Sequence, residues 1–249
     1  MDSSNWLERY RAGDRLGVWA EMRGAGHLVR DPAVIGDAQE VCDEMARRAR
    51  FNIETIVGRL LDQGYLFRNN DDEGQPVIPF RPASEQAGEL LAPLESIVGT
   101  VPLALGSWLR LVGDVWLVGT HPQWSQSDAA DPFVFELEGL RFPEESMTDY
   151  WDSEVEAWNF SREEGDEVSE QFVLPVSPDR LHKANISGGA PYGLRVPDES
   201  VDGTFVAETE FQFVDYLNSV FAGGGFAAPV ASPEQAAVIG SLREGLLEL

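Results

Sequence analysis

The sequence predicts an α+β fold, in which a curved, mostly antiparallel sheet is flanked by helices and preceded by an N-terminal helical region. Apolar residues follow helical spacing through residues 5–64. After residue 113 the pattern changes to short segments rich in β-branched and aromatic residues, separated by Gly, Pro and Asp. Helical spacing returns after residue 208. With 249 residues, 43% of them hydrophobic, the chain is long enough to bury a substantial core.

Residues 1–68 form the predicted helical N-terminal region. Apolar side chains recur at helical spacing from Trp6 to Met22, and a second helical stretch covers residues 37–50. The segment NIETIVGRLLDQG predicts the clearest helix, because Asn52 can cap its start and Gly64 suits its left-handed end. The segment YLF that follows predicts a short strand.

Turn-forming residues, prolines and charges mark residues 69–83 as a linker. A domain over residues 84–228 is predicted next, and a C-terminal helix over residues 229–249. Within the domain, residues 84–99 and 101–113 predict two helices, and a third follows the strands from residue 208. Ser232 and Gln235 form a capping box that opens the C-terminal helix.

Five short segments predict the strands of the sheet: DVWLVG, PFVFELE, QFVLPV, YGLRV and TFVAE. The fourth lies in SGGAPYGLRVPD, where two glycines predict a turn. Alternation of Tyr192, Leu194 and Val196 then predicts a strand with these side chains toward the core.

Residues 144–170 are the most acidic part of the chain, with eleven Asp and Glu against one base, Arg162. This segment is too long and too acidic for a turn between strands. Trp151, Val155 and Trp158 are spaced by four and three residues, which predicts an amphipathic helix with an acidic outer face.

The overall charge argues against a nucleic-acid partner. The chain has 43 Asp and Glu against 18 Lys and Arg, a formal net charge of −25. Such a surface repels phosphate backbones and attracts basic proteins or cations. Helices around Arg47, Arg48, Arg50 and Arg59 resemble a DNA-reading winged helix, but four arginines do not overcome the surrounding acidity, and a packed helical bundle is favoured.

Neither a secretory signal nor an apolar stretch long enough to span a bilayer is present, so we expect a cytoplasmic protein without a membrane partner. Cys42, as the single cysteine, cannot form an internal disulfide. Its place in an amphipathic helix predicts a small buried hydrophobe.

Five segments occur in the order APLESIVGTVPLALGSWLRLVG, DPFVFELE, FVLPVSPDRLHK, GGAPYGLRVPD and EFQFVDYLNSVF. Over roughly residues 93–221 this order resembles the SMI1/KNR4-like (SUKH) superfamily. The resemblance implies a non-catalytic α+β binding scaffold, a type common among bacterial immunity proteins that neutralise toxins. It implies no ligand residues, because binding surfaces differ between members. The long N-terminal helical region and the acidic insertion depart from the family pattern.

The chain has only three histidines, which restricts where a catalytic site could lie. His121 precedes Asp128 and Asp131, and Asp179 lies three residues before His182. If these loops met, they could form a metal-dependent or Ser/His hydrolase site. The spacings match no dense metal motif. We therefore expect no catalytic residues, no metal and no cofactor, and keep a hydrolase using His121 and His182 as the alternative.

The charge and composition predict a non-catalytic acidic protein-binding module that acts by occluding a basic partner, and the SUKH resemblance implies that it is an immunity protein whose partner is a toxin. Charge complementarity and aromatic anchors are the features expected of such a surface. The predicted partner-binding residues are Trp151, Asp152, Glu154, Glu156, Trp158, Glu163 and Glu164. A competing interpretation places both tryptophans in the core and gives the acids only a solvating role. A third makes the C-terminal helix a self-association element.

Overall fold

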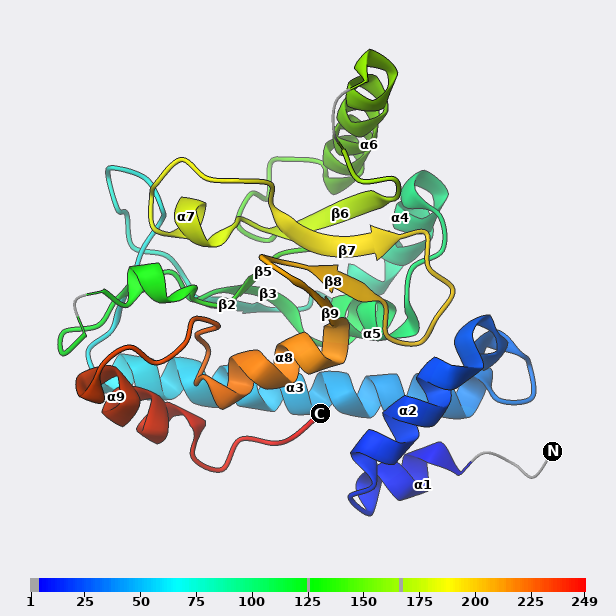
Figure 1. Cartoon of the computed structure of the whole chain (residues 1–249), viewed down its shortest axis with the longest axis horizontal. Helices are drawn as coiled ribbons and strands as arrows, with labels where there is room; N and C mark the ends of the chain where they lie inside the picture. The colour runs from blue at the N-terminus through cyan, green and yellow to red at the C-terminus, as the bar shows by residue number, and fades with distance from the viewer. Residues whose placement is uncertain (1–4, 125, 166–167) are drawn as a thin grey trace.

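The computed structural model describes residues 5–124, 126–165 and 168–249. Its N-terminal region is helical, as predicted, and consists of α1 (Trp6–Arg11), α2 (Arg15–Ala25), the 3-10 turn η1 (Gly26–Arg30) and α3 (Ile35–Asp62). Figure 1 shows α3 running beneath the strands, with α1 and α2 beside one of its ends. The N-terminal helices thus pack on a single long helix that itself supports the sheets.

The predicted helical stretches 37–50 and 52–64 are one continuous helix of 28 residues, α3. Its buried residues recur every three or four positions and include Val41, Met45, Ile53, Ile56 and Leu60. The expectation that Asn52 caps a separate helix is wrong. Asn52 lies inside α3 because no helix-breaking residue precedes it, whereas Gly64, with φ of 76°, does follow the helix end.

Within the described residues, nine strands form three small sheets in which every pairing is antiparallel. The first sheet is β1 (Leu66–Phe67) with β4 (Gly119–Thr120), and the second is β2 (Phe80–Pro82), β3 (Gly113–Trp116) and β5 (Val134–Phe135). The third is β6 (Phe172–Ser177), β7 (Tyr192–Val196), β8 (Thr204–Val206) and β9 (Glu210–Gln212). This arrangement confirms the α+β class, with the strands divided over three sheets.

Two strands lie where the sequence predicted none. Residues 80–82, inside the predicted linker, pair with β3, and Phe80 lies opposite Val115. Residues 210–212, assigned to the start of a helix, pair with β8 before α8 begins. Both segments are short edge strands whose pairing partners are set by the tertiary fold, so local sequence patterns carry little signal for them.

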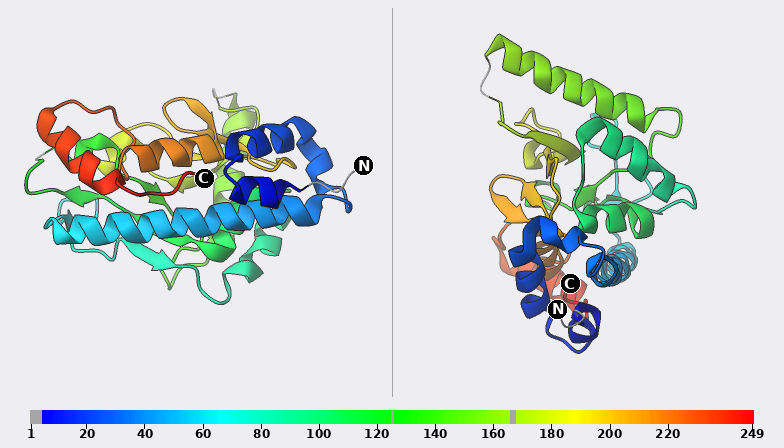
Figure 2. Two further views of the ribbon diagram at one scale, coloured as in Figure 1. Left: turned by 90° about the horizontal axis from the view of Figure 1, so that it is seen from below. Right: turned by 90° about the vertical axis from the view of Figure 1, so that its right-hand side faces the viewer.

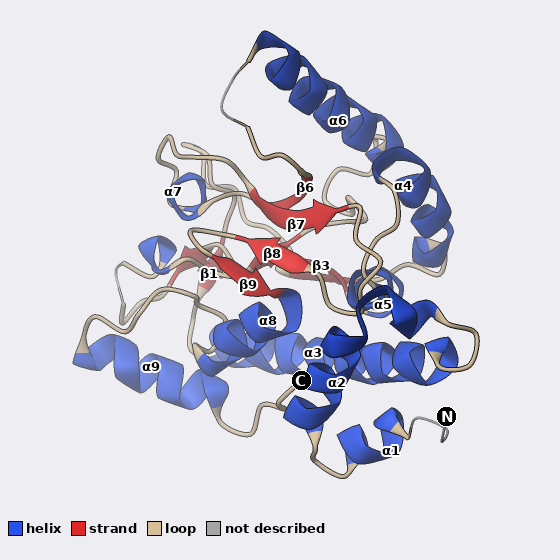
Figure 3. Ribbon diagram, turned by 45° about the vertical axis from the view of Figure 1, so that its right-hand side comes forward, coloured by secondary structure: helices blue, strands red, loops and turns tan. Residues whose placement is uncertain are grey.

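The remaining helices are η2 (Ala87–Leu90), α4 (Leu91–Val98), α5 (Leu103–Leu111), η3 (Asp128–Ala130), α6 (Met147–Glu164), α7 (Arg180–Lys183), α8 (Phe213–Ala222) and α9 (Pro233–Arg243). Figure 3 shows the strands between the helices α3, α8 and α9 on one side and α6 on the other. The main core cluster includes buried residues from Tyr10 to Leu249, and Trp116, Val118 and Val134 form a second, small cluster. Trp108 lies near the centre of the main cluster, 4.7 Å from Phe135 and 5.9 Å from Phe133 between ring centroids.

The end of the described chain is tied back onto α3. Gln235 donates its backbone N–H to the Ser232 hydroxyl over 3.2 Å, which confirms the predicted cap. The helix stops at Arg243, earlier than predicted, and an extended tail follows. The Asn52 side chain donates to the carbonyl of Leu247 and accepts from its N–H, each over 2.7 Å. This pairing explains why a polar Asn52 is fully buried within α3.

A buried ion pair joins α2 to the segment between β7 and β8. Arg23 of α2 donates to the Asp202 carboxylate over 2.7 Å and also contacts Asp215. Asp202 is fully buried and accepts the backbone N–H of Val214 over 2.8 Å. Burial raises the pKa of Asp202 to about 6, and the charge of Arg23 opposes this rise.

This raised pKa gives a testable pH dependence. The folded protein binds the Asp202 proton more tightly than the unfolded chain does, so the resulting stabilisation is complete below pH 4 and is lost as pH rises through 6. Between pH 4 and pH 7, we expect the free energy of unfolding of the wild type to fall relative to Asp202→Asn by on the order of 1 to 3 kcal/mol. Urea unfolding at four pH values measures this. Asp62→Asn, which removes an exposed acid outside this ion pair, is the control. Parallel stability curves for the wild type and Asp202→Asn would contradict the predicted pH dependence.

Candidate functional site

Helix α6 is the most prominent feature of the surface. Ser146 caps its start, where the hydroxyl accepts the N–H of Asp149 over 3.3 Å, and Gly165, with φ of 82°, provides the left-handed end. Figure 1 and the right-hand view of Figure 2 show α6 at the edge of the molecule, reaching away from the strands. The sequence prediction of a helix in the acidic segment is therefore confirmed.

A narrow apolar face attaches α6 to the body of the protein. Trp151 is fully buried, and α6 contacts α4 and β6. Trp158 is half-buried, with its ring centroid 5.7 Å from that of Phe172 and its indole N–H donating to the Ser169 carbonyl over 3.0 Å. Arg162 lies over the outer side of the Trp158 ring, 4.7 Å from the centroid.

The burial of these rings corrects one sequence-based expectation. Trp151 cannot serve as an exposed anchor for a partner, because none of its surface is accessible. Trp158 is engaged by Phe172, Ser169 and Arg162. The alternative that the tryptophans belong to the core is thus confirmed for Trp151 and largely holds for Trp158. The physical reason is that an amphipathic helix buries the apolar face that predicts it.

The acidic side chains of α6 do face solvent. Asp152, Glu156, Glu163 and Glu164 are exposed, and Glu154 is half-buried, with its pKa raised by burial. The exposed aromatic residues of this helix are ones that the sequence analysis missed: Phe160 is 65% exposed and Tyr150 is 38% exposed. Each lies one or two positions from a tryptophan, which at 100° per residue turns it away from the buried face.

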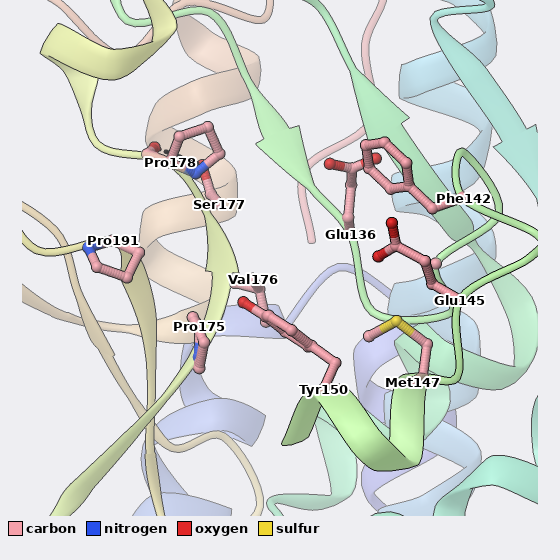
Figure 4. A pocket seen from close by; sticks show the side chains of 11 residues that line it. Glu136, Phe142, Glu145, Met147, Tyr150, Pro175, Val176, Ser177, Pro178 and Pro191 are labelled. Carbon is pink, nitrogen blue, oxygen red and sulfur yellow. Dashed lines mark hydrogen bonds between the residues drawn. The ribbon is translucent and has the colours of Figure 1, made fainter. Parts of the chain in front are cut away.

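A cavity of about 320 Å³ lies at the foot of α6, where the helix starts beside β6. Figure 4 shows its two walls. Pro175, Pro178 and Pro191 form one wall, and Phe142, Met147 and Tyr150 face them from the other. The backbone N–H of Glu136 donates to the Val176 carbonyl over 2.8 Å and joins two segments about forty residues apart, so no local motif predicts this cavity.

Two carboxylates border the cavity. Glu136 forms a two-pronged pair with Arg141, in which Nη2 donates to Oε2 over 3.0 Å. Burial raises the pKa of Glu136 to about 7, although the nearby Arg141 lowers it. Glu145 is exposed at the rim. Tyr150 also lines the cavity, and burial raises its pKa to about 12, with added repulsion from Glu154 and Glu136.

The loop that forms the cavity floor is held by a buried aspartate. Asp114 accepts backbone N–H groups from Leu137 over 2.8 Å, Glu138 over 3.0 Å and Leu140 over 2.7 Å. Gly139 then takes a left-handed conformation, with φ of 74°, and a Cβ atom there would lie 2.5 Å from the Met147 sulfur. Glycine therefore lets the start of α6 pack against this loop.

The two histidines of the hydrolase alternative have separate surroundings. The His121 ring is buried between Gln63, 3.1 Å from Nε2, and the backbone N–H of Gln123, 3.1 Å from Nδ1. Burial lowers the pKa of His121, which favours its neutral form. The His182 ring pairs instead with Asp179, which caps α7. No hydrogen bond between described residues connects the two sites.

Other candidate groups of the sequence also have structural partners. Within residues 5–124, 126–165 and 168–249, no cluster of three or more His, Cys, Asp or Glu is arranged to hold a metal ion. Cys42 is fully buried, as predicted, and burial raises its pKa. Arg48 and Arg50 form ion pairs with Glu44 and Glu54, and Arg59 donates to two backbone carbonyls at the C-terminal end of α9.

Comparisons with known proteins provide no relative for this site: no family model, curated protein or solved structure matches the chain. Among the described helices, none combines the length and apolar character needed to cross a bilayer. Helix α6 and the cavity at its foot are therefore the features of the molecule that indicate a function.

Proposed function

We propose that this protein is a non-catalytic binding module whose acidic helix α6 docks on a basic protein. The observation that carries the proposal is that α6 is attached by a narrow apolar face while five of its acids are exposed to solvent: Asp149, Asp152, Glu156, Glu163 and Glu164. A helix that only completed the core would not need to reach beyond the sheet (Figure 2). Charge complementarity of this kind raises association rates and selects partners of opposite sign.

The class of partner follows from the charge and from the SUKH resemblance. The net charge of −25 gives the protein a negative surface, which favours a basic protein as the partner. The resemblance to SUKH adds the hypothesis of an immunity protein, which blocks a basic toxin by covering its working surface. This role would place the protein in the cytoplasm. The hydrolase alternative gains no support from the separate environments of His121 and His182.

A charge-matched pair of variants tests the proposal. The first variant neutralises α6 by Asp152→Asn, Glu156→Gln, Glu163→Gln and Glu164→Gln. The second neutralises four exposed acids elsewhere, by Glu8→Gln, Glu40→Gln, Asp62→Asn and Glu73→Gln. Both variants change the net charge by the same amount, so a general charge effect acts on them equally.

We expect the α6 variant to bind the basic partner about 10 to 30 times more weakly than the wild type, because exposed charge pairs contribute about 0.3 to 0.5 kcal/mol each. The second variant should bind nearly as the wild type does. To measure this, the wild-type chain and each variant are immobilised, and the proteins that they retain at increasing salt concentrations are identified by mass spectrometry. Equal loss in both variants, or retention that is insensitive to salt, would contradict docking through α6.

A further inference from the structure

The cavity at the foot of α6 is continuous with the acidic helix, because Met147 and Tyr150 belong to both. We propose that this cavity receives an arginine side chain of the protein partner. The inference rests on the proposed function and adds to it the residue type that the partner presents. It concerns a site of about 320 Å³, which is large enough for one long side chain.

The walls of the cavity suit the aliphatic stem of such a side chain. Pro175, Pro178 and Pro191 offer an apolar wall, and Met147 closes the opposite side (Figure 4). Arg and Lys side chains pack their methylene stems along apolar surface while the charged head stays in a polar environment. A short acidic or hydroxylated side chain would leave these walls uncovered.

The aromatic rings and carboxylates suit the charged head. Tyr150 and Phe142 are 38% and 49% exposed, so their rings are accessible at the cavity. Guanidinium groups stack on aromatic faces and bind carboxylates in a planar, two-pronged geometry. The carboxylate of Glu145 makes no ion pair with any described residue, and it lies at the cavity rim.

The carboxylates near the cavity outnumber the cations, so an additional cation would be attracted to it. Arg141 neutralises one carboxylate, Glu136, while Glu145 and Glu154 remain near Tyr150. Arg141 also shows which chemistry this surface accepts, because its guanidinium lies 4.9 Å from the Phe142 ring centroid and 3.4 Å from that of Trp116. A second guanidinium on the Tyr150 side would repeat an arrangement already present beside the cavity.

Small probes test this inference without the partner. We would titrate the full-length, isotope-labelled chain with N-acetyl-arginine amide, N-acetyl-lysine amide and N-acetyl-norleucine amide, following backbone amide signals by NMR. Arginine amide should bind with a Kd of about 1 mM, and its shifts should centre on Gly139, Met147 and Tyr150. Lysine amide should bind at least threefold more weakly, and norleucine amide at least tenfold more weakly.

Two exposed glutamates provide the variant and its control. Glu145→Gln should weaken arginine amide at least threefold and leave norleucine amide unchanged, whereas Glu144→Gln, next to it but outside the cavity lining, should change neither. Equal binding of arginine and norleucine amides would overturn the cationic head, and equal binding of lysine amide would overturn the choice of arginine. Shifts absent from the cavity residues would overturn the site itself. None of these results decides the outcome of the experiment with the charge-matched α6 variants, so the two proposals can fail separately.

Discussion

Replacing Trp151 with Ala is expected to lower the free energy of unfolding by about 3 to 5 kcal/mol, as large-to-small changes of fully buried aromatic residues do. Trp151 is the one fully buried side chain among the described residues of α6, so its loss removes the main apolar attachment of the helix. Urea unfolding followed by circular dichroism measures the change. The affinity for the basic partner should also fall, because α6 is no longer held in place on the body of the protein.

The matched control is Phe160→Ala on the same helix. Phe160 is also a large aromatic residue, but 65% of it is exposed, so its removal should change stability by no more than about 0.5 kcal/mol. Trp151→Phe should cost less than Trp151→Ala, because the indole N–H of Trp151 has no partner among the described residues. Equal effects of Trp151→Ala and Phe160→Ala would contradict the packing described for α6.

Replacing Lys183 with Met should also destabilise the fold by about 3 to 5 kcal/mol. Lys183 is fully buried in α7, and its Nζ donates to Asp131 over 2.7 Å, which ties α7 to the end of η3. Burial lowers the pKa of Lys183, while the carboxylate of Asp131 raises it. The variant leaves Asp131 buried with an unpaired negative charge. Chemical unfolding of the two proteins at neutral pH measures the difference.

A double variant separates the lost pair from the lost packing. Asp131 has φ of 53°, and Asn tolerates this left-handed conformation well. Lys183→Met combined with Asp131→Asn should therefore recover more than 1 kcal/mol relative to Lys183→Met alone, since no buried charge remains. If the double variant were less stable than the single one, the destabilisation would not arise from the unpaired carboxylate.

The sequence was most informative where structure is local. Spacing of Trp151, Val155 and Trp158 predicts α6, and Ser232 predicts the start of α9. Alternation predicts β7, in which Tyr192, Leu194 and Val196 are buried as expected. Each of these signals depends on residues a few positions apart, which a periodic helix or strand brings to one face.

The sequence was least informative where distant segments meet. Asn52 has the residue type of a helix cap, yet its partner is Leu247, which is 195 residues away. The cavity likewise combines residues near 140 with residues near 180, and neither segment alone contains a binding motif. The spacing of Trp151 and Trp158 that predicts the helix also predicts that both rings lie on its buried face. The expectation that these rings are exposed anchors therefore contradicts the pattern from which the helix is predicted.

The most direct test of docking through α6 is amide hydrogen exchange of the full chain, free and in complex with the basic protein that it retains. A helix attached through a single fully buried residue should exchange readily in the free protein. We expect binding to slow exchange across residues 147–164 and to leave the helices α1 and α9 unchanged. Slowed exchange at α1 or α9, with residues 147–164 unaffected, would contradict the account.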